Sequence, residues 1–212
     1  MKASNYKYLI AIIFIFFGEQ IAAEDRIVIN FESPPSLNQE AKLIQNIKNY
    51  NSVQSIENYL TQQNWIENFL IKSSFFGKFH QIFIQSKKPK YVWKDKFYID
   101  SQVSTFAYDG GYPDLIRLDM PLEYLTFWIK AENQYITLFN DLSLTIRSVG
   151  FQPAVGWYLH TSDALRVNLG DDLSNDTYQK LSLTLKYMFE NNLTPSIIDL
   201  RYKAGAALNY GK

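Results

Sequence analysis

Hydrophobic positions along this chain of 212 residues form one apolar segment near the N-terminus and then a series of short periodic segments. The apolar segment covers residues 8–23 and is interrupted by Gly18-Glu19-Gln20, and from residue 26 onward the apolar positions recur with the period of a strand or a helix. A run of about 17 to 25 apolar residues is needed to span a bilayer, whereas periodic segments bury one face against a core. The pattern therefore predicts a terminal apolar segment followed by folded protein.

Residues 26–85 are predicted to form a strand, two helices and two further strands, in that order. The first helix begins after Ser36, which together with Gln39 fits a reciprocal capping arrangement. A small sheet with both helices on one face satisfies this order, which is an α+β arrangement. The five elements are expected over residues 26–31, 37–47, 53–60, 66–75 and 79–85.

Strands predominate from residue 92 onward, and two segments have helical spacing. The helices are expected over residues 121–133 and 177–191. Residues 93–100 are predicted to form a strand, a turn and a second strand. Patterns typical of strands are also found over residues 103–108, 142–147, 155–160, 165–169, 197–202 and 206–210.

The last two of these strands close the chain and are predicted to form a hairpin. In residues 197–202, Ile198, Leu200 and Tyr202 alternate with the other three positions. Because little chain follows residue 210, the last strand is expected at a sheet edge, where unpaired backbone groups must be covered or used. The small residues 204–207 would let another backbone approach, so we predict that this edge is a docking site.

The apolar run near the N-terminus allows two interpretations. Lys2 and Lys7 precede it, which places the N-terminus in the cytoplasm if the segment is kept as an anchor. The same basic start, together with Ala22-Ala23, also fits a cleaved signal peptide. N-terminal sequencing of the mature protein distinguishes the two, and both place residues 26–212 outside the cytoplasm.

Composition excludes several classes of function. Lys plus Arg and Asp plus Glu number 21 each, so no basic excess suggests nucleic-acid binding. Cysteine is absent, and His80 and His160 lack the spacing of metal ligands. No catalytic set accompanies either histidine, and Asp171-Asp172 lacks the other oxygen ligands of a calcium loop. We therefore expect neither an enzyme nor a cofactor or metal site.

Several short motifs resemble those of the FtsQ/DivIB family of bacterial cell-division proteins, and the match is closer to FtsQ. The start of a strand at residues 64–66 and the turn at residues 75–79 resemble the POTRA module of that family. The segment Lys88-Pro-Lys-Tyr-Val-Trp93 is similar to its domain junction, and Asp199-Leu-Arg-Tyr202 with Gly205 and Ala207 to its closing hairpin.

The resemblance implies an α+β protein with an N-terminal transmembrane helix, a small β-α-α-β-β POTRA domain and a mostly antiparallel β domain with two helices. The expected divisions are a cytoplasmic tail over residues 1–7, a transmembrane segment over 8–23, a POTRA domain over 26–91 and an FtsQ-like β domain over 92–212. A non-enzymatic scaffold at the division septum is implied, linking early and late division proteins from the inner membrane, with its bulk in the periplasm.

The partners of that family are FtsB and FtsL, and the resemblance implies that they bind the closing edge strand by β-strand addition. It also implies that the POTRA domain contacts other division proteins. The partner-binding residues carried over by position are Tyr202, Ala204, Gly205, Leu208, Asn209 and Tyr210. A second interpretation stays open, in which the chain is a secreted periplasmic module of the POTRA type that binds or assembles envelope proteins.

Overall fold

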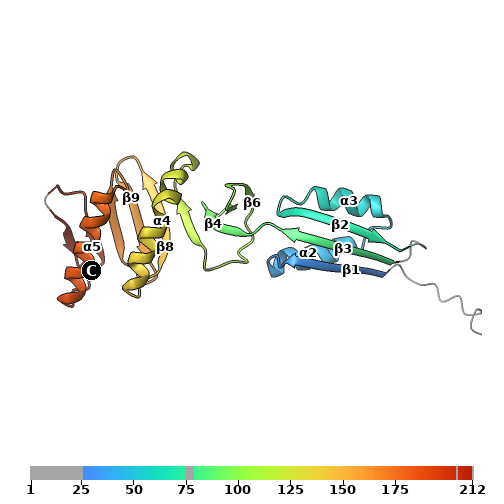
Figure 1. The fold of residues 1–212 in the computed structure, drawn as a ribbon, viewed down its shortest axis with the longest axis horizontal. Helices are drawn as coiled ribbons and strands as arrows, with labels where there is room; N and C mark the ends of the chain where they lie inside the picture. The colour runs from blue at the N-terminus through green and yellow to red at the C-terminus, as the bar shows by residue number, and fades with distance from the viewer. Residues whose placement is uncertain (1–25, 75–78, 204, 212) are drawn as a thin grey trace, which may run out of the picture. The chain divides into compact units, whose positions relative to one another are not determined.

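The computed structural model describes residues 26–74, 79–203 and 205–211 (Figure 1). These residues form two compact units, the first of residues 26–35 and 40–86 and the second of residues 36–39 and 87–211. Four helices and twelve strands are found in the described residues, so the fold is of the α+β type.

Residues 26–86, most of which belong to the first unit, contain the five elements that the sequence predicts, in the predicted order. The sheet of this unit has the strand order β1-β3-β2, with β1 parallel and β2 antiparallel to the central strand. The elements are β1 (Arg26–Ser33), α2 (Leu37–Ile47), α3 (Val53–Thr61), β2 (Ile66–Ser73) and β3 (Phe79–Ser86).

Capping and burial explain where these two helices begin and which side they bury. The backbone N–H of Gln39 donates to Ser36 Oγ at 3.1 Å, and the Ser36 N–H donates to Gln39 Oε1 at 3.2 Å, so the predicted capping arrangement is confirmed. Ser52 caps α3 through the N–H of Ser55. The apolar core lies between the helices and one face of the sheet and includes Leu43, Ile47, Ile56, Leu60, Ile82 and Ile84.

The second unit is a nine-stranded sheet with two helices. The strand order is β12-β11-β10-β9-β8-β7-β4-β5-β6. The pairings β4–β7, β7–β8 and β10–β11 are parallel and the other five are antiparallel. The elements are β4 (Pro89–Trp93), β5 (Phe97–Asp100), β6 (Thr105–Ala107), β7 (Ile116–Asp119), α4 (Leu122–Asp141), β8 (Ile146–Gln152), β9 (Gly156–Thr161), β10 (Arg166–Gly170), α5 (Asn175–Glu190), β11 (Ile197–Asp199) and β12 (Ala207–Asn209). The expected boundary between residues 91 and 92 therefore falls inside β4, which pairs with β5 and β7.

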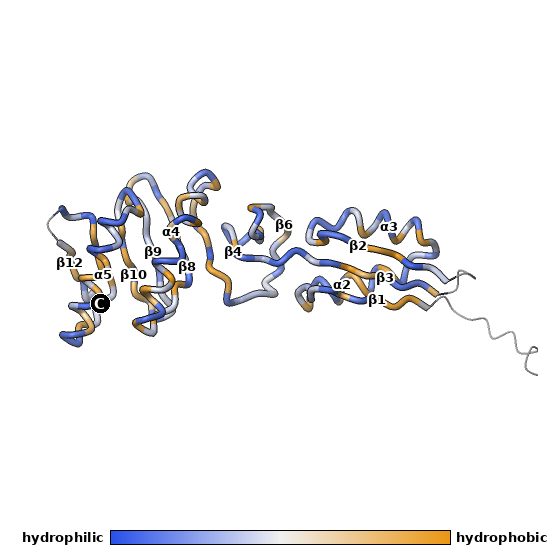
Figure 2. The backbone as a smooth tube through the Cα atoms, viewed as in Figure 1, coloured by the Kyte–Doolittle hydropathy of each residue, from blue (hydrophilic) through white to orange (hydrophobic). Residues whose placement is uncertain are grey.

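Helices α4 and α5 pack on the same face of this sheet. Side chains from both helices, such as Trp128 and Leu185, share one apolar core with alternate strand residues such as Leu159 and Val167. The residues between these strand positions are mostly polar, so hydrophilic and hydrophobic colours both occur along the strands in Figure 2. Strand residues alternate between faces, so a sheet covered on one side separates apolar from polar positions.

The strand predicted over residues 142–147 is wrong in its first half. Helix α4 continues to Asp141, beyond the predicted end at residue 133, and β8 begins only at Ile146. Ser143 takes a positive φ of 59°, and the N–H of Leu144 donates to Phe139 O at 2.9 Å, which closes the helix end. The alternating leucines of this segment pack on the core from a helix cap, where they mimic the pattern of a strand.

A buried carboxylate joins α4 to β4. Glu132 is buried and accepts hydrogen bonds from Lys90 Nζ and from the Tyr91 hydroxyl. Burial, together with Glu132, raises the pKa of Tyr91 well above its ordinary value. Because both partners satisfy the same carboxylate, the charge is compensated inside the unit.

No helix among the described residues is long and apolar enough to cross a membrane. The apolar segment predicted over residues 8–23 lies outside the described residues.

At Gly150 in β8 the structure leaves no room for a side chain. A Cβ at this residue would overlap the ring of Tyr158, whose hydroxyl donates to Asp119 Oδ2 at 2.6 Å. We expect Gly150→Ala to displace this ring and lower the free energy of unfolding by about 1–3 kcal/mol, as measured by urea denaturation. Gly211→Ala is the control, because its Cβ would meet only Asn209 Oδ1 at 3.4 Å and Ser196 Oγ at 3.7 Å. Equal stability of the two variants would contradict this assignment.

Candidate functional site

The closing strand β12 lies at the end of the nine-stranded sheet, as the sequence predicts. Helix α5 connects β10 to β11, which pairs with β10 in parallel, and β12 then pairs with β11 antiparallel. Among the described residues β12 has no second strand neighbour. Its outer backbone groups are therefore available to another chain, because neither proline nor a charged side chain protects residues 207–209.

The turn before β12 is held by two cations. The Arg201 guanidinium donates to Asp199 through Nη2 at 2.6 Å and through Nε at 2.9 Å, and the Arg201 N–H donates to the same carboxylate at 3.1 Å. Lys180 of α5 donates to the carbonyls of Leu200 and Tyr202 at 3.0 and 2.9 Å. These bonds tie the turn to both the sheet and α5.

This turn also corrects the predicted extent of the first hairpin strand. Strand β11 ends at Asp199, so Tyr202 lies beyond it. Ile198 and Leu200 are buried as the alternation predicts, but Tyr202 is 60% exposed. The Asp199 side chain accepts the backbone N–H of Arg201, which bends the chain out of the ladder.

The structure places the six predicted partner-binding residues in two groups around β12. Leu208 is half-buried toward the core, Asn209 is exposed, and Tyr210 follows the strand with 53% of its surface exposed. Tyr202 and Gly205 lie in the turn at the other end of the strand, and Gly205 has a φ of 144° that side chains rarely adopt. Ala204 lies outside the described residues.

A groove of about 650 Å³ begins where the ladder between β11 and β12 ends. Tyr210 lines it together with Phe189 of α5, Leu165 and Pro195. Phe189 and Tyr210 are both exposed aromatic residues, which adds apolar surface beside the edge strand. Helix α5 buries Leu181, Leu185 and Met188, whereas Phe189 lies off this stripe and is 47% exposed.

Sequence reasoning also missed two serine–histidine pairs. Ser148 Oγ lies 3.2 Å from His160 Nδ1, and Ser73 Oγ lies 2.9 Å from His80 Nδ1. Each pair joins neighbouring strands, and no carboxylate bonds to either imidazole among the described residues. Burial and the neighbouring Arg166 lower the pKa of His160. Each pair is a hydrogen bond that joins two neighbouring strands of a sheet.

The described residues hold no group of three or more His, Cys, Asp or Glu side chains close enough to share a metal ion. The arrangement at β12 has the features of a protein-binding edge: open backbone groups, exposed tyrosines and an adjacent apolar groove.

No family model matches the chain. Over 166 residues it is 20% identical to the cell division protein FtsQ of Aliivibrio fischeri. The chain is similar to FtsQ. This finding confirms the resemblance drawn from the motifs. The match covers 74% of this chain and 62% of that FtsQ, so the chain spans less than two thirds of its relative.

In this FtsQ-like chain, loss of Arg201 from the turn before β12 should change the pKa of Asp199. Hydrogen bonding to Arg201 lowers the pKa of Asp199 in the folded state, so the pair stabilises the fold at pH 7. This stabilisation is lost as the pH falls below about 4, when the carboxyl protonates. We expect Arg201→Gln to raise the pKa of Asp199 toward its ordinary value in a carboxyl NMR titration. Arg147→Gln, whose partner is Asp114, should leave the titration of Asp199 unchanged.

Proposed function

We propose that this protein is a non-enzymatic scaffold of the bacterial division machinery that works at the septum. The observation that carries the proposal is the open edge strand β12, found within a chain that is similar to FtsQ. The name of that relative, cell division protein, supports a role in cell division. The exposed edge supports a role in binding rather than catalysis.

The proposed binding mode is β-strand addition. A segment of FtsB, in complex with FtsL, would pair its backbone with β12 and extend the nine-stranded sheet. Main-chain hydrogen bonds would provide affinity, and Tyr202 and Tyr210 at the two ends of the strand would select the partner's side chains. Gly205, Leu208 and Asn209 lie between these tyrosines, and Ala204 belongs to the same proposed surface by its position in the sequence.

The first unit is proposed to be a POTRA domain that contacts other division proteins. Its β-α-α-β-β order and its sheet with helices on one face support this assignment. The apolar segment over residues 8–23 is proposed to anchor the protein in the inner membrane, with the two units in the periplasm.

A fluorescent fusion should test the process in which the protein acts. Fused at its N-terminus and produced at native level, the full chain is expected to form a band at midcell in dividing cells. The readout is the ratio of midcell to peripheral fluorescence. A uniform peripheral signal in cells that are constricting would overturn the proposed role in division.

The edge itself is tested by hydrogen exchange and by substitution of its tyrosines. Adding the extracytoplasmic segment of FtsB from the same bacterium should slow amide exchange over residues 205–211, because strand pairing protects backbone N–H groups. The double variant with Tyr202→Ala and Tyr210→Ala should bind this segment at least about tenfold more weakly in calorimetry.

Phe127→Ala provides the matched control for the two tyrosines. Phe127 is an aromatic residue of α4 with 57% of its surface exposed, so its truncation removes a similar area away from β12. Binding by this variant is expected to equal that of the unmodified chain. An equal loss of affinity in the Phe127 and tyrosine variants would show that the edge is not the docking site.

A further inference from the structure

On the face of the second sheet opposite α4 and α5, one arginine has no carboxylate partner among the described residues. Four arginines have side chains that the structure describes, and three of them form an ion pair with an aspartate. These pairs are Arg117–Asp95, Arg147–Asp114 and Arg201–Asp199. Arg166 of β10 is the fourth, and no carboxylate of the described residues lies within ion-pair distance of it.

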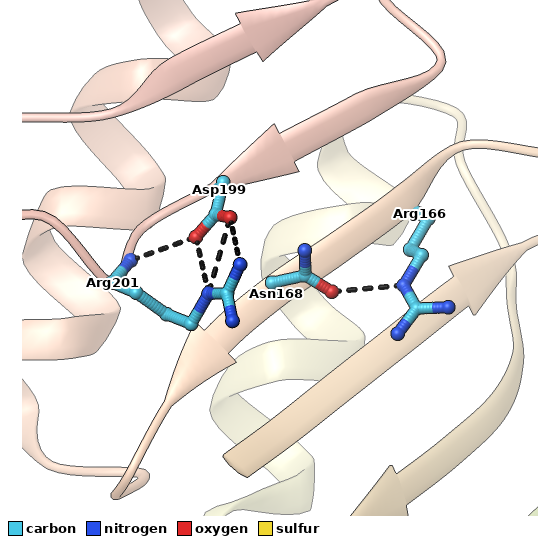
Figure 3. Close-up of polar contacts among 4 residues, drawn as sticks. All are labelled: Arg166, Asn168, Asp199 and Arg201. Carbon is cyan, nitrogen blue, oxygen red and sulfur yellow. Dashed lines mark hydrogen bonds and ion pairs between the residues drawn. The ribbon is translucent and has the colours of Figure 1, made fainter. Parts of the chain in front are cut away.

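Neighbouring side chains hold the Arg166 guanidinium in place without neutralising it. Its Nε donates to Asn168 Oδ1 at 2.8 Å, and its central carbon lies 4.9 Å from the centroid of the Tyr158 ring. Tyr158 is itself fixed by its hydrogen bond to Asp119. In Figure 3 the Nε of Arg166 faces Asn168, and one terminal nitrogen points away from Asn168, Asp199 and Arg201. A guanidinium has five N–H donors, so four remain for a ligand.

Strand register connects this cation to the proposed docking edge. Arg166 pairs with Ile197 of β11, and Ile197 pairs with Asn209 of β12. Directly paired residues lie on the same face, so these three side chains form one row across the sheet. Two strand spacings separate Arg166 from Asn209, which is about 10 Å. The half-buried Ile197 provides an apolar surface between them.

We propose that Arg166 binds a carboxylate of the protein that docks on β12. The partner's segment would continue from the paired strand across Asn209 and Ile197 and place an aspartate or glutamate against the guanidinium. A planar fork that is already oriented matches a carboxylate with two parallel hydrogen bonds. This inference rests on the proposed edge docking, because the row begins at β12.

Charges around Arg166 favour a single carboxylate over a polyanion. The other described arginines of this unit are paired, and burial and Arg166 lower the pKa of the neighbouring His160. A nucleic acid or an anionic lipid surface is bound by clusters of cations. An isolated, fixed guanidinium beside an apolar strip instead fits an acidic residue within a protein segment.

Calorimetry with the full chain in detergent micelles tests this inference, using the extracytoplasmic segment of FtsB as the probe. We expect Arg166→Gln to weaken binding about tenfold and to reduce its dependence on salt concentration. Arg166→Lys keeps the charge but not the fork and should bind with intermediate affinity. Arg147→Gln is the control, since that arginine is already paired and partly exposed, and its binding should change less than twofold.

Charge reversal separates a direct contact from a structural effect. In the Arg166→Glu variant, replacing one acidic residue of the probe by arginine should restore binding, and the residue that does so identifies the contact. If no such replacement restores binding, or if Arg166→Gln binds like the unmodified chain, the inference is overturned. Loss of binding in the tyrosine variants together with normal binding by Arg166→Gln would overturn only the role of Arg166. Normal binding in both would overturn the edge docking as well.

Discussion

Burial of one face of the nine-stranded sheet under α4 and α5 is the constraint on which the rest of the second unit depends. Aromatic and aliphatic side chains of both helices share one core with alternate residues of the strands. Because alternation is strict along a strand, burying one face exposes the other, and the exposed face must be polar or bind something. The exposed face is polar because it holds the ion pairs, the serine–histidine pair and the stacked Arg166.

The position of β12 follows from the same packing. Helix α5 lies on the covered face between β10 and β11, so the chain returns to the sheet in parallel beside β10, and the closing hairpin can only extend the sheet outward. Lys180 of α5 and the Asp199–Arg201 pair then fix the turn. An edge strand of three residues is short, and natural sheets often limit their edges in this way. Here the strand has no proline and no charge, which is why we interpret it as a surface for a partner.

The two units differ in how they satisfy their polar groups. The first is a three-stranded sheet whose helices are closed by local caps at Ser36 and Ser52. The second relies on contacts between residues distant in sequence, such as Glu132 with Tyr91 and Tyr158 with Asp119. Partners from separate strands and helices meet only when the sheet has formed, so these bonds report on tertiary structure rather than on local preference.

The sequence by itself determined the order of the first five elements, the capping of the first helices and the similarity of the chain to FtsQ, because periodicity and short motifs act over a few residues. It did not reveal strand β7. It could not distinguish a strand from a helix end at Leu142 and Leu144, where both bury alternate leucines. Nor could it place Arg166 in one row with Ile197 and Asn209, since this row arises from pairing between β10, β11 and β12. Only the tertiary structure decided which strands pair with one another and which described arginine has no carboxylate partner, because strand register and the contacts of side chains are long-range properties.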